Sequence, residues 1–455
     1  MHRPVDAASL AFVRVVFGCV MLVEISRYWS HGWIREYFVE PKFFFSYPLF
    51  GWVRPLPAAW LTVQFDLLAL AAMCIVLGLF TRIAAAVFSV LFAWWFLSDQ
   101  TNYLNHFYLI TLVSFLFVFV PTERTFSLDA RFRRPPGTRR SPAAETVPAW
   151  AVWIFRFQIG APYFFGGIAK LNPDWIAGEP MRMWLRDMKS VPLLGLVCTQ
   201  EWCVYGFVVG GLLLDLLVVP GLLWKRTRAF AFAAALLFHG TNAIIFSIGI
   251  FPWLMIAATT IFFEPDWPRR VLALLGVRAQ GPPRADAPAA VERSTARSLG
   301  MAGLAAWIAL QIGLPLRHFL YPGYASWTEE GHLYSWHMKL RDKAGYGEFI
   351  ARDAANGASW KIDPRDYLEK RQEREMYGHP DEILQFAHHV ADEYAKAGKG
   401  RLEVRARIFV SLNGRKPQLI VDPEVDLAAQ PRSLGRWPWI LPLAEPLQSP
   451  ANRGT

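Results

Sequence analysis

The sequence contains little cysteine and lacks the residue patterns of common metal and nucleotide sites. Its four cysteines, among 455 residues, are Cys19, Cys74, Cys198 and Cys203. The first two lie in apolar runs and are packing candidates, whereas Cys198 and Cys203 could pair or pack, at a spacing that fits no zinc or haem motif. No set of His, Cys and carboxylate residues has metal-ligand spacing, and no glycine-rich phosphate loop follows a strand. We therefore expect no metal and no nucleotide site of this kind.

Apolar residues, by contrast, are abundant. The chain is 54% hydrophobic and 15% aromatic, with 20 Trp and 34 Phe, which is more apolar than a typical soluble protein. These residues form blocks of roughly 15–25 residues, long enough to cross a bilayer. The formal net charge of +10 does not indicate nucleic acid, because the arginines cluster in short loops between apolar blocks, as they do on the cytoplasmic side of membrane proteins. The composition predicts an integral protein of a lipid bilayer.

The order of apolar and polar segments predicts about nine transmembrane helices. The connection after the fourth helix is strongly basic at residues 131–134 and 139–140, and we assign it to the cytoplasm. This assignment places the amino terminus inside and the carboxyl-terminal region outside. The first apolar block has no small-residue cleavage site and is expected to remain as a span. The predicted spans are residues 7–26, 58–80, 83–98, 104–121, 148–169, 202–223, 228–247, 250–264 and 299–315.

From about residue 316 the pattern is that of a folded α+β domain. A helix is predicted from Asp381 to Gly398, because its apolar residues share one face. Alternating residues from Leu402 onward, followed by Asn413-Gly414, predict a hairpin. Further strands are expected at residues 336–343, 347–352 and 359–363.

The predicted fold class is an all-α polytopic membrane domain followed by an α+β extramembrane domain. The predicted boundaries are 1–275 for the first eight helices, 276–298 for a cytoplasmic Ala/Pro/Arg-rich linker, 299–315 for the ninth helix and 316–455 for the external domain.

Ionisable residues at membrane depth mark the candidate site. Lys170 ends an apolar run, and loss of hydration disfavours the charged form of an amine, so we expect a neutral base at the rim of the hydrocarbon. Arg156 is expected to form a buried pair with Asp215 or Asp66. Pro162 and three nearby glycines predict a broken fifth helix that opens a cavity beside Lys170.

Several further polar residues accompany the predicted spans. Asp99, Asn105 and His106 flank the start of the fourth helix, on the same predicted side as Lys170, and His239 lies near the middle of the seventh. Residues 388–389 are two histidines in the predicted helix of the external domain, where we expect a solvated face.

Motifs along nearly the whole chain occur in the order found in one enzyme family. Residues 163–175 resemble the catalytic-lysine region of that family, and Asn105-His106 matches its Asn-His pair. The other similar segments are residues 3–10, 54–57, 238–239, 246–252, 318–320, 323–324, 327–328, 335–336 and 422–426. The sequence therefore resembles the vitamin K-dependent gamma-glutamyl carboxylases.

The resemblance implies a membrane enzyme that uses reduced vitamin K (phylloquinol or menaquinol), O2 and CO2 to carboxylate glutamyl side chains of a peptide or protein, with formation of the quinone epoxide. Lys170 would be the base that removes the quinol proton, which requires a site kept from water. His106 would assist catalysis and, with Asn105, hydrogen-bond the cofactor or a developing oxyanion. Asp99 and His239 are further candidate cofactor contacts, with simple packing left open for His239.

The chain also departs from the animal enzymes. His332 stands where they carry a tyrosine, and the cysteines that join their first loop to the external domain are missing, with Phe45 and residues 388–389 in their place. These departures indicate a bacterial-type member in a plasma membrane and leave the glutamyl substrate open. Two alternatives remain: quinol epoxidation without carboxylation, and a non-enzymatic membrane protein that binds or transports a lipid or solute.

Overall fold

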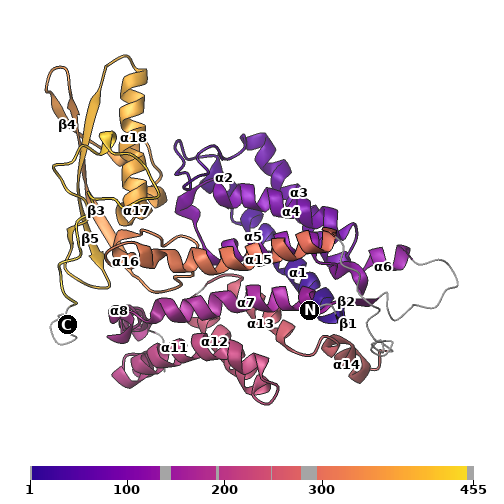
Figure 1. Ribbon diagram of the computed structural model, residues 1–455. Coiled ribbons are helices and arrows are strands. Elements are labelled where there is room, and N and C mark those ends of the chain that lie inside the picture. Colours follow the sequence, from indigo (N-terminus) through magenta and orange to yellow (C-terminus); the bar gives the residue numbers. More distant parts are fainter. Residues whose placement is uncertain (1–2, 134–144, 191–193, 247, 278–294, 448–455) are drawn as a thin grey trace.

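A bundle of helices is followed by an α+β domain, joined through the long helix α15 (Thr295–Leu316) (Figure 1). The computed structural model describes residues 3–133, 145–190, 194–246, 248–277 and 295–447. Most of the predicted linker, and residues 134–140 of the predicted basic connection, lie outside the described residues.

A helix occurs at each of the nine predicted spans. These helices are α1 (Ala8–Ser30), α3 (Ala58–Leu77), α4 (Thr81–Leu97), α5 (Asn105–Phe119), α7 (Ala149–Lys170), α11 (Glu201–Leu223), α12 (Arg228–Ile245), α13 (Phe251–Thr259) and α15. Five of the described helices, α1, α3, α11, α12 and the one running through α15 to Leu320, are long and apolar enough to cross a membrane. Because α4, α5 and α13 have only 17, 15 and 9 residues, they fall below the usual spanning length.

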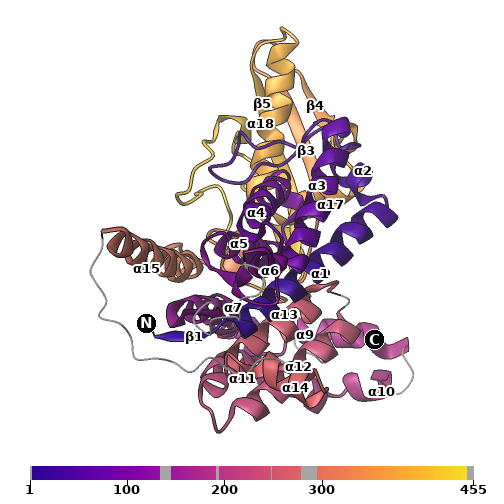
Figure 2. The same ribbon diagram turned by 90° about the vertical axis from the view of Figure 1, so that its right-hand side faces the viewer.

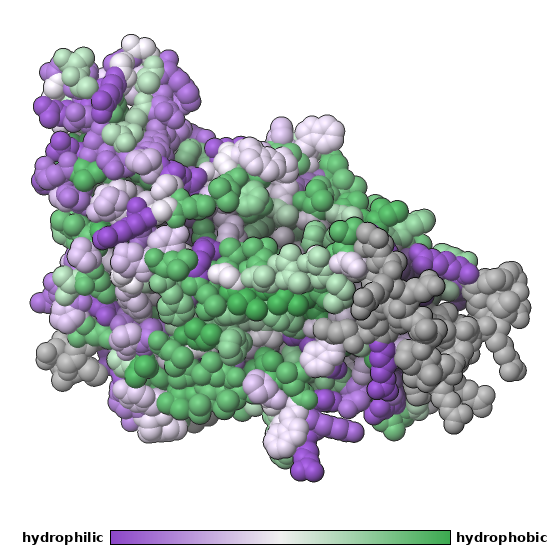
Figure 3. Space-filling view, viewed as in Figure 1, coloured by the Kyte–Doolittle hydropathy of each residue, from purple (hydrophilic) through white to green (hydrophobic). Residues whose placement is uncertain are grey.

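The outer surface agrees with a membrane location. Apolar residues cover the visible face of the helices, whereas polar residues cover the C-terminal domain (Figure 3). Helix α15 stands beside the bundle (Figure 2), and only 11% of its apolar window is buried. The protein is therefore an integral membrane protein, with five helices of spanning length among the described residues.

Shorter elements connect the bundle. The two short strands β1 (Pro4–Asp6) and β2 (Thr146–Pro148) pair antiparallel and bring the amino terminus beside the start of α7. The short helices are α2 (Trp33–Phe38), α6 (Leu128–Phe132), α8 (Pro173–Ile176), α9 (Met181–Arg186), α10 (Leu194–Cys198), α14 (Trp267–Leu274) and α16 (Ala325–Thr328).

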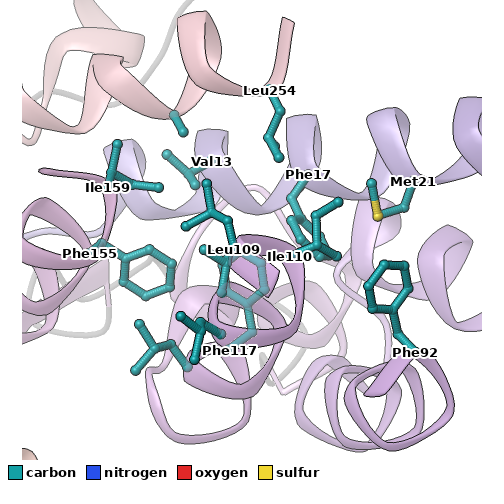
Figure 4. Close-up of a cluster of buried hydrophobic side chains, with 14 of the residues drawn as sticks. Val13, Phe17, Met21, Phe92, Leu109, Ile110, Phe117, Phe155, Ile159 and Leu254 are labelled. Carbon is teal, nitrogen blue, oxygen red and sulfur yellow. The ribbon is translucent and has the colours of Figure 1, made fainter. Parts of the chain in front are cut away.

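Aromatic packing around α1 holds the bundle together (Figure 4). Phe17 of α1 meets Phe88 of α4 and Phe117 of α5 edge-on, with ring centroids 5.6 and 5.1 Å apart. Leu254 of α13 approaches the same cluster from the opposite side of α1. Since lipid tails are as apolar as these side chains, contact geometry rather than exclusion from water favours the association.

The predicted break in the fifth helix is wrong. Helix α7 runs without interruption from Ala149 to Lys170 and includes Pro162. Its glycines instead permit close packing on α11: a Cβ at Gly167 would lie 2.7 Å from Leu216, and one at Gly160 would lie 3.3 Å from Val219. Small residues at helix contacts are the usual means of such close approach in membranes.

The C-terminal domain is a four-stranded antiparallel sheet with two helices on one face (Figure 1). The sheet order is β4-β3-β5-β6, and Lys343 pairs with Leu412 at one end of the β3–β5 ladder. This confirms the predicted α+β class. The elements are β3 (Lys343–Asp353), β4 (Ser359–Ile362), α17 (Lys370–Gly378), α18 (Pro380–Lys396), β5 (Leu402–Leu412) and β6 (Gln418–Leu419).

One predicted strand, residues 336–343, is absent from the structure. Strand β3 begins only at Lys343, because the preceding segment contains four non-glycine residues with positive φ. These are Glu329 (63°), Tyr334 (63°), Trp336 (59°) and Lys339 (52°). Left-handed residues turn the chain away from an extended course, and such strained positions cluster at functional sites.

The loop between α2 and α3 is attached to the C-terminal domain without a disulfide. Phe45 is fully buried in the core of that domain, and the ring of Phe43 stacks on His389 with centroids 4.3 Å apart. The predicted solvated face at residues 388–389 is therefore wrong, since His388 Nε2 also lies 2.8 Å from the carbonyl oxygen of Gln430. Aromatic packing thus attaches the loop to the domain.

Candidate active site

A cavity of about 490 Å³ lies between α7, α11, α12 and α13. Its lining is mostly apolar, with the polar side chains of Lys170, Asp215 and His239 on its walls. Trp202 and Leu237, which are 68% and 73% exposed, stand on its rim. The cavity therefore opens on the apolar outer surface of α11 and α12, where lipid would contact the protein.

Lys170 and Asp215 form a buried pair on the wall of this cavity. The Lys170 Nζ lies 2.5 Å from Asp215 Oδ2, and the two residues are 5% and 3% exposed. The amine also lies 5.2 Å from the ring centroid of Trp175, whose Nε1 donates to the Val208 carbonyl oxygen at 3.0 Å. The amine is thus buried beneath Trp175 rather than placed at an open rim. A desolvated amine beside a carboxylate can pass a proton across a short hydrogen bond.

The predicted pairing of Arg156 with Asp215 or Asp66 is wrong. Arg156 donates instead to the carbonyl oxygens of Ile261 and Phe263, at 3.0 and 2.9 Å, and Asp66 is exposed. Arg156 lies roughly 20 Å from Lys170 along the axis of α7. A buried carboxylate in a span requires a partner, but the sequence could not select between the two cations of α7.

The C-terminal domain closes over the end of α7. Arg415, just after the Asn413-Gly414 turn, places Nη1 and Nη2 each 2.7 Å from the carboxylate oxygens of Asp174. Asn413 Nδ2 donates to the same carboxylate at 2.8 Å. Asp174 belongs to α8, which follows Lys170 directly. The hairpin predicted from the sequence therefore positions the segment that covers the lysine.

His239 contributes a short chain of hydrogen-bonding groups. Its Nε2 lies 2.6 Å from Tyr163 Oη, which lies 3.0 Å from Thr259 Oγ1. The histidine is 1% exposed, and its Nδ1 has no hydrogen-bond partner among the described residues. Both His239 and Tyr163 line the cavity. Sequence reasoning missed Tyr163, although it begins the segment that resembles the catalytic-lysine region.

His106 lies behind the cavity wall rather than on it. Its ring centroid is 5.7 Å from that of Phe251, which lines the cavity and lies 6.0 Å from the His239 ring. Asn105 is nearby, where its Oδ1 accepts a hydrogen bond from Tyr103 Oη at 3.1 Å. The aromatic side chain of Phe251 therefore separates His106 from the cavity.

Asp99 lies where the α2–α3 loop contacts the C-terminal domain. It is fully buried and accepts hydrogen bonds from the Phe45 and Thr101 backbone amides and from Gln372 Nε2, at 3.3, 3.2 and 3.1 Å. These contacts fasten the α2–α3 loop and the start of α5 to the C-terminal domain. The structure brings Lys170 and His239 into one cavity, but it does not place Asp99 there.

Two cysteines lie near the same cavity. Cys203 lines it, and Cys198 is buried next to it in the same apolar cluster. Both are free thiols that interact with one another. They form no disulfide in this structure.

Another, smaller cavity of about 180 Å³ lies between the C-terminal domain and the loops that precede α3 and α5, and charged residues form part of its lining. Glu329 forms ion pairs with Arg341 and with Lys343. Burial raises the pKa of Glu329, but the charges of Arg341 and Lys343 together hold it below its usual range. Burial lowers the pKa of Lys343 to about 8. Burial also lowers the pKa of the nearby His332 well below its usual range.

An integral membrane protein with a lipid-facing cavity and a buried lysine–carboxylate pair is the class that this geometry defines. Residues 2–267 match the HTTM domain, and residues 296–446 match the lumenal domain of vitamin K-dependent gamma-carboxylase. The chain belongs to the vitamin K-dependent gamma-carboxylase family, which confirms the resemblance. No solved structure matches the chain.

Proposed function

We propose that the protein is a membrane enzyme that carboxylates glutamyl side chains, using reduced vitamin K (phylloquinol or menaquinol), O2 and CO2, with formation of the quinone epoxide. The observation that carries the proposal is the buried Lys170–Asp215 pair on the wall of a cavity that opens toward lipid. Membership of the family supports the quinone and the glutamyl substrate, because its named members are carboxylases.

The size and lining of the cavity support a quinone as its ligand. Its volume of about 490 Å³ lies within the range of typical ligand pockets, which are apolar with a few polar groups. Gly206 and Gly210 line the cavity on α11, and neither would bring a Cβ near another side chain. The open side between α11 and α12 therefore leaves room for a hydrocarbon tail that extends into the membrane.

In this proposal, Lys170 and Asp215 move the proton. When Asp215 holds the shared proton, the amine is neutral and can accept a proton from a hydroxyl group in the cavity. After this transfer the Lys170 ammonium donates a hydrogen bond to the neutral carboxyl group of Asp215, and the deprotonated hydroxyl carries the negative charge. Trp175 and the C-terminal domain exclude water from above, which keeps the amine desolvated. Bound reduced vitamin K would supply, with O2, the strong base that removes the glutamyl γ-hydrogen.

Other residues take supporting roles. We propose that His239, through its cavity-facing position, orients the ring of the cofactor, with Tyr163 and Thr259 fixing the imidazole. The catalytic role of His106 and the cofactor role of Asn105 are supported by their match to the Asn-His pair of the family. The contacts of Asp99 favour a structural role in joining the two parts of the protein.

The orientation in the membrane follows from the same arrangement. We propose a cytoplasmic amino terminus and an external C-terminal domain in a bacterial-type plasma membrane, as the basic connections indicate. Because Asp174, four residues after Lys170, is bound by Arg415 of the C-terminal domain, the glutamyl substrate would reach the lysine from the external side.

The test uses the purified protein in detergent with reduced vitamin K, labelled bicarbonate and a glutamate-rich peptide. We expect quinone epoxide and labelled carboxylate in the peptide. Epoxide without fixed label would support the epoxidase alternative and rule out carboxylation. The absence of both products would overturn the proposal in favour of a binding or transport protein.

A further inference from the structure

Lys339 reaches the same cavity from the C-terminal part of the chain. It lies in the strained segment between α16 and β3, with φ of 52°, and it lines the cavity together with Met338. Its Nζ lies 5.2 Å from the ring centroid of Trp184 and 5.5 Å from that of Phe246. The residue remains exposed. An amine is therefore held over two aromatic rings where the cavity meets the C-terminal domain.

Two other cations of this region, Lys170 and Arg182, already form ion pairs. Lys170, the other lysine of the cavity, is bound to Asp215 at 2.5 Å. Arg182, on α9 beside Trp184, binds Glu179 and Glu201 at 2.6 and 2.7 Å. Neither cation is available to an incoming anion without the loss of an existing ion pair.

Lys339 differs from both cations. Across the described ranges it makes no hydrogen bond and no ion pair, and its amine lies over the two aromatic rings. Asp342 acts on it only through space, and the Oδ2 of Asp342 accepts a hydrogen bond from Trp184 Nε1 at 2.9 Å. Although the residue as a whole is exposed, partial burial of its amine lowers the pKa of Lys339, against the opposing effect of Asp342. An anion that reached this amine would replace interactions with water that the cation has partly lost.

We propose that Lys339 binds the side-chain carboxylate of the glutamyl substrate at the edge of the cavity. This inference rests on the proposed function, and it assigns substrate recognition to a residue separate from the proton-transfer pair. A carboxylate held at Lys339 would direct its γ-carbon into the cavity, toward Lys170. Because glutamine lacks the charge for an ionised hydrogen bond, Lys339 would discriminate glutamyl from glutaminyl peptides.

The test measures the binding of fluorescently labelled peptides to the full-length protein in detergent. One peptide contains glutamate, and the matched peptide contains glutamine at the same position. We expect the wild type to bind the glutamate peptide about tenfold more tightly. Lys339→Met should abolish this preference, and Lys339→Arg should retain most of it, because the cation is restored. Lys399→Met is the matched control, since the Lys399 amine lies over Tyr394 at 5.5 Å and does not line the cavity.

The outcomes separate this inference from the proposed function. A wild type without a preference for glutamate, or a Lys339→Met variant that keeps it at an unchanged melting temperature, would overturn the role of Lys339. If the wild type also forms epoxide and fixes CO2, the proposed function survives that result. Selective binding that depends on Lys339, in a protein that forms no epoxide, would keep the carboxylate site and overturn the enzyme proposal.

Discussion

Two buried ionic groups in this protein differ in how completely their charges are compensated. In the membrane cavity, one cation, Lys170, meets one anion, Asp215, and the rest of the wall is mostly apolar. In the C-terminal domain, one anion, Glu329, meets two cations, Arg341 and Lys343. A carboxylate held by two cations resists protonation. We propose that a pair of one cation and one anion in an apolar wall can instead exchange a proton, so that Lys170 and Asp215 form the reactive group and Glu329 belongs to a structural one.

The largest effect is expected at Lys170. Lys170→Ala should reduce epoxide formation by a factor of about 100 or more, since a positioned base typically contributes 10²–10⁴-fold. Product formation from reduced vitamin K measures the loss. Lys225→Ala, at an exposed lysine just beyond α11, is the control and should keep its activity. If Lys170→Ala kept activity within twofold of the wild type, Lys170 would not be the catalytic base.

Asp215→Asn tests whether the pair is an ionic unit. The substitution leaves a buried amine without its carboxylate, and the free energy of unfolding should fall by about 3–5 kcal/mol. The double variant Lys170→Met, Asp215→Leu should recover stability, because apolar replacement of a buried pair is tolerated, while its activity stays lost. Thermal unfolding in detergent, followed beside the epoxide assay, distinguishes these results. A stable and fully active Asp215→Asn variant would contradict the paired role.

Glu329→Gln tests whether the ionic group of the C-terminal domain contributes to stability. At neutral pH we expect a loss of about 3 kcal/mol in the free energy of unfolding, since two partly buried cations, Arg341 and Lys343, lose their common partner. Epoxide formation per folded molecule should change little.

The pH dependence of this difference follows from the lowered pKa of Glu329 in the folded protein. The stabilisation is present above the ordinary carboxyl pKa and is lost as the pH falls through the folded value. The stability advantage of the wild type over Glu329→Gln, measured by thermal unfolding, should therefore shrink in acid. An advantage that stays constant down to the acid transition would show that the carboxylate charge is not what stabilises the domain.

The smallest effect is expected at Tyr163. Tyr163→Phe removes the hydroxyl between His239 and Thr259, and each such hydrogen bond contributes about 1 kcal/mol. We expect the rate of epoxide formation to fall by up to about tenfold with little change in melting temperature. His239→Ala should produce a loss of similar or greater size. Unchanged kinetics in both variants would show that the hydrogen bonds among His239, Tyr163 and Thr259 serve packing and not catalysis.

Much of the architecture is local and could be predicted from the sequence. Apolar runs marked all nine bundle helices, alternation marked β5, and Asn413-Gly414 marked its hairpin. Residues 336–343 were misread as a strand, because the apolar pattern does not reveal that Trp336 and Lys339 adopt positive φ. Pro162 was misread as a break, because the packing of α7 on α11 tolerates it within a continuous helix.

The sequence by itself determined that this is an integral membrane protein, that it has an α+β domain and that Lys170 ends an apolar run. Tertiary structure alone decided that Asp215 belongs to Lys170 rather than to Arg156, that Phe251 separates His106 from the cavity, and that Lys339 enters it. Periodicity is a property of one segment. The choice of partner depends on how each helix is rotated and crossed against its neighbours, which only the folded chain specifies.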